Sequence, residues 1–349
     1  MTASGLAAVT AAHGASQEMG IDFFAESPVL QSLQPVIDGS RNVRTNPDAI
    51  ERVASWMAYE EFGIPGGLLQ FDMGRDVDVL TDMIMLANSL NFAYTDFDTS
   101  VKFIVEYQGR SWVDADGMAA SFDKAWRAGV PILTGEWMAQ LTRAELAGIF
   151  AGNIEMPMLD ERVAVINDLG GVLVDRFDGR FSNWVRSCER AIFADGNGLL
   201  ERMRVDFPRF NDVTTYDGHE IQFFKLGQLA LWGLHAMYVH LGEPGLRDLH
   251  RMSAFADYIV PVALRVMGVM EYTDDLDHRI NSGVEIPRDS RDEIEIRAHA
   301  LYGTALLTEA CNRRRPDDLQ LVIPQIDYRL WSHYHVTHWP HHLTRTIMY

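Results

Sequence analysis

The 349-residue chain has few cysteines and no long apolar run. Its two cysteines, Cys188 and Cys311, show no spacing typical of a metal site and are too few for a disulfide framework, which favours a reducing compartment. No run approaches about eighteen apolar residues, and residues 1–20 lack the basic start and apolar centre of a signal peptide. We therefore expect a cytoplasmic protein with no membrane partner.

Positive charge is also scarce. The chain has 49 Asp and Glu against 30 Lys and Arg, a net charge of −19. A surface of that sign repels the phosphate backbone of a duplex, so we expect a small-molecule partner and no duplex nucleic acid. There is no glycine-rich phosphate loop, and the tail histidines, such as His333 and His335, have no partner at customary ligand spacing. Neither a metal nor another cofactor is expected.

The pattern that is present is helical, and it predicts a mainly α fold. Helices are predicted at about 28–34, 47–62, 76–90, 115–129, 142–150, 159–175, 181–191, 195–205, 224–240, 247–256, 261–270, 291–312 and 317–331. Residues 91–112 alternate and carry aromatic and β-branched residues, so they are expected to form a strand or small β hairpin. Residues 1–20 are expected to be a mobile tail. Residues 21–349 are expected to form one compact catalytic unit, either undivided or with two lobes around the site.

Asp257 stands among apolar residues within the stretch from Met252 to Tyr272. Pro261 follows four residues later, where its ring would clash with the carbonyl of Asp257 in a continuous helix, so the helix is expected to kink or restart there. Apolar neighbours would then desolvate the carboxyl group, and the helix dipole would favour its charged form. Asp257 is a candidate catalytic carboxylate. A capping or salt-bridged aspartate without chemistry is the alternative.

Two further charged residues have apolar neighbours. Lys225 is the second residue of the predicted helix at 224–240, which is apolar nearly all round, and shares a face of it with Gln228. A buried ammonium needs a carboxylate, a phosphate or a ligand, so Lys225 either pairs with a structural acid or belongs to a site. Asp327 lies among bulky apolar residues and is a second candidate buried carboxylate.

The predicted helix at 291–312 carries its own charged residues. Glu293 and Arg297 are four residues apart and are expected to pair. Glu295 and Arg297 either line a site or form surface ion pairs, and the surface interpretation is favoured.

Several short motifs follow one another from about Arg41 to Tyr349. They are Asn91-Phe92; Ala125 to Ile132 with its Arg-Ala-Gly-Val-Pro-Ile core; Met158-Leu159-Asp160-Glu161-Arg162; Phe207-Pro208-Arg209-Phe210-Asn211-Asp212; Phe223-Phe224-Lys225 with Gln228; Phe255-Ala256-Asp257-Tyr258 with Pro261; Glu295-Ile296-Arg297-Ala298; Asp327 with Leu330-Trp331; and Thr344-Arg345-Thr346 with Tyr349. In the order of these motifs the chain resembles the queuosine salvage proteins, also called queuosine 5′-phosphate N-glycosylase/hydrolases.

The resemblance implies a helical fold similar to that of helix-hairpin-helix DNA glycosylases, with a small β element. It implies an enzyme that releases the base queuine from queuosine 5′-monophosphate, or from a closely related 7-deazaguanine nucleotide or nucleoside, for queuine salvage. By the same resemblance Asp257 carries hydrolysis, Lys225 assists and Asp327 holds the base. These residue types suit the reaction, because an ionised carboxylate can stabilise an oxocarbenium-like ribose while it orients or deprotonates water.

The remaining site candidates are aromatic or polar. Phe92, Phe224, Tyr258 and Trp331 could form a stacking slot for the base or could be core residues, and Gln228 joins them as a substrate-binding candidate.

The chain departs from the family where it has Lys225-Leu226-Gly227-Gln228 in place of Lys-Arg-Ala-Gln, which removes one cation. Arg345, between two threonines, is expected to contact the 5′-phosphate instead. A different class of function is a helical nucleotide- or nucleobase-binding protein that keeps the site without turnover.

Overall fold

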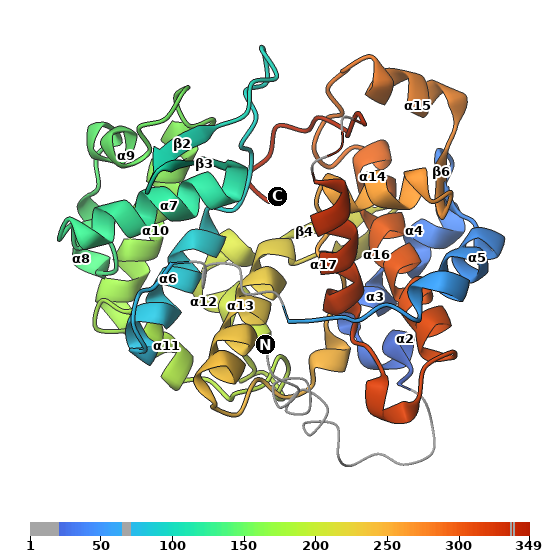
Figure 1. The fold of residues 1–349 in the computed structure, drawn as a ribbon, viewed down its shortest axis with the longest axis horizontal. Helices are drawn as coiled ribbons and strands as arrows, with labels where there is room; N and C mark the ends of the chain where they lie inside the picture. Colours follow the sequence, from blue (N-terminus) through green and yellow to red (C-terminus); the bar gives the residue numbers. More distant parts are fainter. Residues whose placement is uncertain (1–20, 65–70, 336, 338) are drawn as a thin grey trace. The chain divides into compact units, whose positions relative to one another are not determined.

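The computed structural model describes residues 21–64, 71–335, 337 and 339–349, so the tail predicted at residues 1–20 lies outside the described residues. In the described part helices dominate, and the strands are short and pair antiparallel (Figure 1). The prediction of a mainly α fold is confirmed, while the similarity to helix-hairpin-helix glycosylases stays a prediction. None of the described helices is long and apolar enough to cross a membrane.

The chain divides into two compact units, which we call unit 1 and unit 2. The described residues of unit 1 lie in Met1–Pro65, Asp212–Gln228 and Arg247–Arg345; those of unit 2 lie in Gly66–Asn211, Leu229–Leu246 and Thr346–Tyr349. Helix α13 (Lys225–Leu241) gives its first turn to unit 1 and its remainder to unit 2. All the predicted site residues except Phe92 belong to unit 1.

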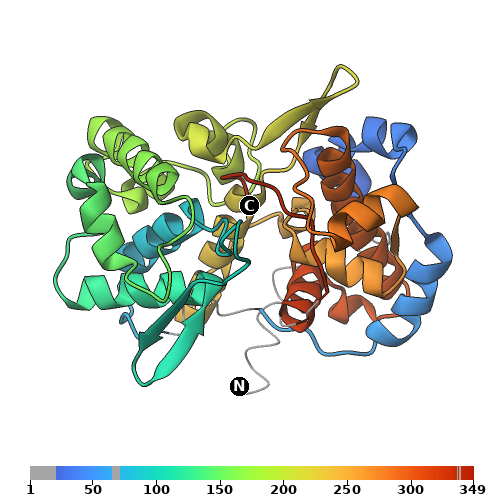
Figure 2. The same cartoon turned by 90° about the horizontal axis from the view of Figure 1, so that it is seen from above.

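Unit 1 is organised around its longest described helix, α16 (Arg291–Asn312). Its other elements are α2 (Phe23–Glu26), α3 (Pro28–Ser32), α4 (Gln34–Gly39), β1 (Val43–Thr45), α5 (Pro47–Met57), β4 (Val213–Tyr216), β5 (His219–Gln222), η3 (Leu249–Arg251), α14 (Ile259–Val266), β6 (Met270–Tyr272), α15 (Asp274–Asn281), η4 (Asp317–Leu319) and α17 (Ile323–Tyr334). Strand β1 pairs with β6, and β4 pairs with β5 in a hairpin that projects from the helices of this unit (Figure 2).

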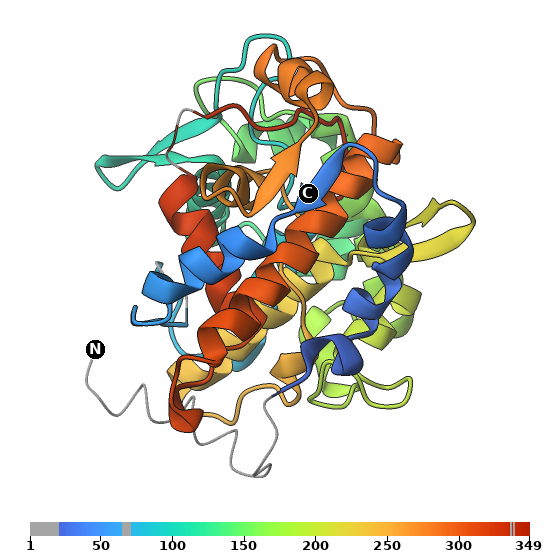
Figure 3. The same cartoon turned by 90° about the vertical axis from the view of Figure 1, so that its right-hand side faces the viewer.

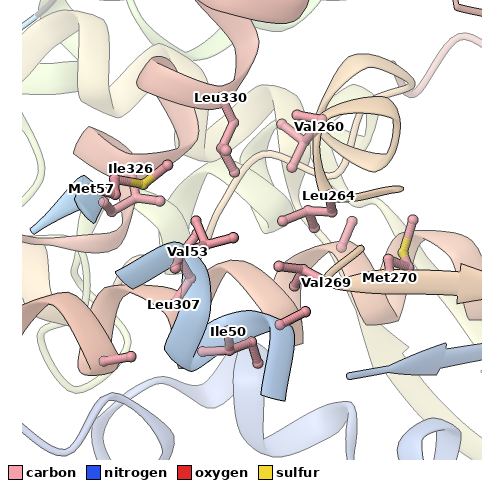
Figure 4. Packing of buried hydrophobic residues seen from close by; sticks show 14 of the residues in the cluster. Ile50, Val53, Met57, Val260, Leu264, Val269, Met270, Leu307, Ile326 and Leu330 are labelled. Carbon is pink, nitrogen blue, oxygen red and sulfur yellow. The ribbon is translucent and has the colours of Figure 1, made fainter. Parts of the chain in front are cut away.

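The core of unit 1 forms where α5, α14 and α17 pack on α16. Helices α5 and α16 run side by side (Figure 3). Ile50, Val53 and Met57 share one face of α5 and are buried, as their helical spacing predicts. Val260 of α14 and Ile326 of α17 belong to the same apolar cluster (Figure 4). This packing fixes α17, which carries Asp327, and α14, which begins two residues after Asp257.

Unit 2 is also mostly helical. It contains α6 (Val77–Ser89), β2 (Ile104–Tyr107), β3 (Arg110–Val113), α7 (Asp114–Arg127), α8 (Gly135–Gln140), α9 (Arg143–Ile149), α10 (Leu159–Arg176), α11 (Phe181–Arg186), α12 (Leu199–Asp206) and η2 (Pro208–Phe210). Strands β2 and β3 form a hairpin, so the β element predicted within residues 91–112 is confirmed in its second half. Helix α10 packs on α8 at Gly170, where a Cβ would lie only 2.6 Å from the carbonyl carbon of Met138. That glycine allows close helix packing.

The segment before the first candidate carboxylate differs from its prediction. A helix is predicted over residues 247–256, but only the single turn η3 forms. The prediction is wrong because side chains bind the backbone of this segment from elsewhere in unit 1. Gln228 Oε1 accepts the N–H of Ser253, and Asp327 Oδ1 accepts the N–H of Phe255, each over 2.8 Å. With these donors satisfied, the segment has no need of helical hydrogen bonds.

Other differences concern element ends and turns. Helix α14 begins at Ile259, so Pro261 is its third residue. The first N–H groups of a helix have no acceptor within the helix, so the proline costs α14 no hydrogen bond there. The hairpin β4–β5 was not predicted, although Asp217-Gly218 between alternating residues is a hairpin signal. Both turn residues have positive φ, +47° and +85°, as a type I′ turn requires.

Candidate active site

Asp257 lies just ahead of helix α14 and is only 7% exposed. Its Oδ1 accepts the backbone N–H groups of Ile259 (2.8 Å) and Val260 (3.0 Å). The carboxyl group therefore does cap a helix, as the alternative interpretation of this residue holds, but with one oxygen. Its Oδ2 accepts no hydrogen bond from any residue in the described part of the chain. That oxygen can therefore contact a substrate or a water molecule.

Opposing effects set the charge of Asp257. Burial raises the pKa of its carboxyl group above the ordinary value, because a charge in a dry environment is poorly solvated. The ammonium of Lys225, the two backbone N–H groups and the imidazole of His335 act in the other direction and lower that pKa. The outcome is a poorly hydrated carboxyl group whose ionised form depends on a neighbouring cation.

Asp327 is a second buried carboxyl group of unit 1 and stands on α17. Its Oδ1 accepts the N–H of Phe255, which ties α17 to the chain two residues before Asp257. Burial raises the pKa of Asp327 well above its ordinary value, and the negative charge of Asp257 raises it further, against the Phe255 N–H and the charge of Lys225. The two carboxyl groups are thus electrostatically coupled, and Asp327 holds its proton more firmly than an exposed aspartate would.

Lys225 is buried at the start of α13, and its charge acts on both carboxyl groups. Its backbone N–H donates to Asp212 Oδ2 over 3.3 Å. The preceding residue, Phe224, is buried and has a φ of +49°, a left-handed conformation that is costly for a bulky side chain. Such a conformation persists only where surrounding contacts impose it, which is typical of functional sites.

Gln228 follows Lys225 by one turn of α13 and is fully buried. Its Nε2 donates to the carbonyl of Phe223 (2.9 Å) and to Ser253 Oγ (2.8 Å), while Oε1 accepts the Ser253 N–H. Both ends of the amide therefore hold backbone and hydroxyl groups of unit 1. The predicted contact of Gln228 with substrate stays a prediction.

Two aromatic rings in this part of unit 1 are partly exposed, and each packs against an imidazole. Tyr258, which directly follows the first carboxylate, lies against His341 with ring centroids 4.5 Å apart. Trp331, one turn beyond the second carboxyl group on α17, stacks on His335 with centroids also 4.5 Å apart. Flat, partly exposed rings of this kind can take a nucleobase against their faces.

Glu295 and Arg297 are both buried, so the prediction that they form surface ion pairs is wrong. Arg297 pairs with Asp212 at 2.6 Å, and Glu293 lies 3.6 Å from Arg297, as the four-residue spacing predicts. Glu295 accepts the hydroxyl of Tyr216 over 2.9 Å. Because α16 is enclosed by other elements of unit 1, its charged residues lie inside the unit and not on its surface.

The structure does not group Phe92 and Arg345 with the buried carboxyl groups. Phe92 belongs to unit 2, where its buried ring lies 4.2 Å below the guanidinium of Arg162 and 5.1 Å from that of Arg209. Arg345 has a half-exposed side chain, with Nη2 3.8 Å from Glu285 Oε2. The stacking role of Phe92 and the phosphate contact of Arg345 stay predictions.

Three residues of this region were not singled out from the sequence as site residues. Asp212 ends the Phe-Pro-Arg-Phe-Asn-Asp motif, and an acid that closes a motif with two phenylalanines is a signal that the sequence offers. In the sequence His335 is only one of several tail histidines, yet its interaction with Asp257 lowers the pKa of that carboxyl group. His342 is buried, and burial lowers its pKa to about 3, so the ring is neutral; no sequence pattern marked it.

The arrangement suits the cleavage of a bond at a carbon that becomes cationic. A dry, ionised carboxylate stabilises such a carbon more strongly than a hydrated one, because water does not screen the interaction. A second, proton-holding carboxyl group and two flat rings can orient a polar aromatic leaving group. Among the described residues, no three His, Cys, Asp or Glu side chains come together in a way that could hold a metal ion.

Comparison with known proteins agrees with this chemistry. Residues 72–349 match the family described as queuosine salvage protein. The chain is 31% identical over 324 residues to the queuosine 5′-phosphate N-glycosylase/hydrolase of Sphaerobacter thermophilus, covering 92% of this chain and 97% of that protein. It is 27% identical over 324 residues to the protein of that name from Schizosaccharomyces pombe (88% and 91% covered) and 24% identical over 319 residues to the one from Bos taurus (87% and 92%).

Proposed function

The chain belongs to the queuosine salvage protein family, and we propose that it is an N-glycosidase that hydrolyses queuosine 5′-monophosphate to queuine and ribose 5-phosphate. The observation that carries the proposal is the pair of buried carboxyl groups, Asp257 and Asp327, under the charge of Lys225 in one unit. Each carboxyl group uses Oδ1 for a backbone N–H, and neither Oδ2 accepts a hydrogen bond from a described residue.

Asp257 is assigned the hydrolytic role. As the bond between C1′ and the base nitrogen breaks, its electron pair leaves with the base and positive charge develops on the ribose. The ionised Oδ2 of Asp257 stabilises that charge and orients or deprotonates the water whose oxygen bonds to C1′. The proton lost by the water balances the one that the departing base takes up. Lys225 supports this step because its charge favours the ionised form of Asp257.

Asp327 is assigned to the base. The guanine-like edge of queuine offers an N1–H and an amino group, which are donors that a carboxylate accepts in a paired geometry. The ring carbon at the 7-position cannot be protonated as a purine nitrogen can, so more of the barrier falls to stabilisation of the ribose and to hydrogen bonds on the base edge. Tyr258, Trp331 and Phe224 are proposed to stack on the base.

The proposal extends to partners and place of action. An acidic chain with two free cysteines is suited to a free mononucleotide in a reducing cytoplasm and unsuited to a duplex. Neither a metal nor another cofactor is proposed, because water and two carboxyl groups provide the groups that hydrolysis needs.

The test is to incubate the protein with queuosine 5′-monophosphate, queuosine and GMP and to measure free base by mass spectrometry. Queuine is expected from the 5′-phosphate, less from the nucleoside, and guanine is not expected from GMP. If no substrate yields free base while queuine binds, the protein is a non-catalytic binder and the proposed function is rejected.

A further inference from the structure

A buried ion pair joins α16 to the segment that precedes α13. Arg297 donates from Nη1 to Asp212 Oδ1 (3.1 Å) and from Nη2 to Asp212 Oδ2 (2.6 Å), and both side chains are at most 6% exposed. The free energy needed to remove two charges from water is roughly as large as the free energy gained from their attraction, so a buried ion pair is weak evidence for added stability. The pair is better explained by what its two members hold.

Arg297 holds the segment that carries Asp257. Its Nε donates to the carbonyl of Ala256 over 3.3 Å, and that carbonyl belongs to the peptide bond that leads into Asp257. The guanidinium also lies 4.0 Å from the ring centroid of Phe223, and Glu293 is 3.6 Å away. The planar, five-donor guanidinium can serve all these directions at once, which the single ammonium of a lysine cannot.

Asp212 holds the segment that carries Lys225. Its Oδ2 accepts the N–H of Lys225, and its backbone carbonyl accepts the N–H groups of Phe223 (3.0 Å) and Phe224 (3.3 Å). These contacts surround the left-handed φ of Phe224. A strained residue keeps its conformation only when its surroundings impose it, and Asp212 binds a backbone N–H on each side of that residue.

We propose that the Arg297–Asp212 pair is a positioning device for the reaction, which sets the backbone of Lys225 against that of Asp257. The inference rests on the proposed function, because it assigns the pair no contact with substrate. The pair binds the backbone N–H of Lys225 itself and the backbone carbonyl of Ala256, the residue before Asp257. A displacement of about 1 Å between reacting groups can lower a rate by about a hundredfold, so a loosened pair should act on turnover more than on binding.

The test uses Asp212→Asn and Arg297→Lys in the full-length protein. Asparagine keeps the size of the side chain and one acceptor, so this variant should fold even if Arg297→Lys does not. For both variants kcat is expected to fall by about 10- to 100-fold while KM for queuosine 5′-monophosphate changes by less than about threefold. A KM that rises with an unchanged kcat, or a kcat within twofold of wild type in Asp212→Asn, would overturn the proposal.

A second readout does not depend on activity. Amide hydrogen exchange at residues 223–225 should become faster in Asp212→Asn, while exchange in α5 of the same unit stays unchanged. Unchanged exchange at 223–225 would also overturn the positioning role. If the wild type releases no base but exchange responds as expected, the proposed function is rejected and the fixing of this backbone by Asp212 is supported.

The matched control is Arg279→Lys. Arg279 pairs with Asp275 and Asp292 elsewhere in unit 1, at the partly exposed end of α15. This variant loses the same guanidinium geometry, and it is expected to leave kcat and the exchange at 223–225 at wild-type values. A fall in kcat equal to that of Arg297→Lys would show a general loss of packing and would count against the positioning role.

Discussion

The backbone N–H of Phe255 donates to Asp327 Oδ1 over 2.8 Å, so the carboxyl group proposed to hold the base is fixed to the segment that carries Asp257. The two acids are therefore coupled twice, through this bond and through their charges. A change in the protonation of one acts on the pKa of the other. The pH dependence of substrate binding and that of bond cleavage should accordingly be linked. Separate measurements on variants of each residue can test this link.

Asp257→Asn should abolish base release, with a loss on the order of 10³-fold or more, because the neutral amide cannot stabilise a cationic ribose. The amide oxygen can still accept the N–H groups of Ile259 and Val260, so the helix cap and queuine binding should remain. Release of queuine is measured by mass spectrometry and binding by calorimetry. A variant that hydrolyses at the wild-type rate would remove the assignment.

The same variant has a stability signature. Burial raises the pKa of Asp257 in the folded protein, so its neutral form favours folding at low pH and this contribution is lost as pH rises through the folded pKa. Asparagine stays neutral at every pH. Asp257→Asn should therefore melt at the same temperature as the wild type or higher at pH 7 to 8, and the difference should vanish near pH 3.

Lys225→Met should move the acid limb of the pH–rate profile to higher pH. The ammonium lowers the pKa of Asp257, so its removal lets burial raise that pKa further and a higher pH is needed to ionise the carboxyl group. Activity at pH 7 is expected to fall by about 100-fold and to recover in part at pH 9. Lys225→Arg keeps the charge and should keep the acid limb in place; an unshifted limb in Lys225→Met would contradict the role.

Binding of queuine should release a proton from Asp327. Its pKa is raised well above the ordinary value, so the free protein keeps a proton on this carboxyl group to higher pH than an exposed aspartate does, whereas the donors on the base edge require it ionised. Calorimetry of queuine binding in two buffers of different ionisation enthalpy should show a net release of protons on binding. Asp327→Asn should show no release and at least tenfold weaker binding. Equal enthalpies in both buffers for the wild type would refute the assignment.

Much of the fold follows from local patterns in the sequence. The helix predicted at 291–312 matches α16, and the helix predicted at 47–62 begins where α5 does, because periodicity and capping act within a few residues. The helix predicted over residues 247–256 is wrong because distant residues determine the conformation of this segment. Its backbone is bound by Gln228 and Asp327, residues about 25 and 70 positions away, which local propensity cannot register.

The site shows the same division. The burial of Asp257, Lys225 and Asp327 could be predicted because each charge stands among apolar residues in the sequence; their roles in the reaction stay proposals. The sequence predicts Arg297 to be a surface residue, because a pattern of charges spaced by four does not reveal that other elements enclose α16 on several sides. The pairing of Arg297 with Asp212 joins residues 85 positions apart, and only the tertiary structure reveals it.

Two buried histidines should make stability depend on pH in the acid range. His299, whose ring nitrogens contact Thr45 Oγ1 (2.8 Å) and Ser40 Oγ (3.0 Å), has a pKa lowered by burial to about 4, and that of His342 is lowered to about 3. Their contributions are present above the unfolded value of about 6.5 and are lost as pH falls towards the folded values. Each should remove about 1.4 kcal/mol per pH unit in that window.

Urea denaturation between pH 7 and pH 4.5 measures this dependence. His299→Gln, which retains hydrogen-bonding groups but cannot titrate, should reduce the slope of unfolding free energy against pH by about one proton. The exposed His219→Gln serves as the control and should leave the slope unchanged. An identical slope in His299→Gln and the wild type would contradict the prediction.

Arg345→Gln tests the source of phosphate recognition. The chain lacks one cation of the family pattern at Leu226, and Arg345 has a half-exposed guanidinium whose pairing with Glu285, at 3.8 Å, is loose enough to yield to a doubly charged phosphate. If it contacts the phosphate, KM for queuosine 5′-monophosphate should rise by about tenfold while kinetics with the unphosphorylated nucleoside stay unchanged. Arg288→Gln, which removes a comparably exposed arginine paired with Asp289, is the matched control and should change neither substrate. An equal rise in KM for both substrates would show that Arg345 supports the fold of the C-terminal segment and does not read the phosphate.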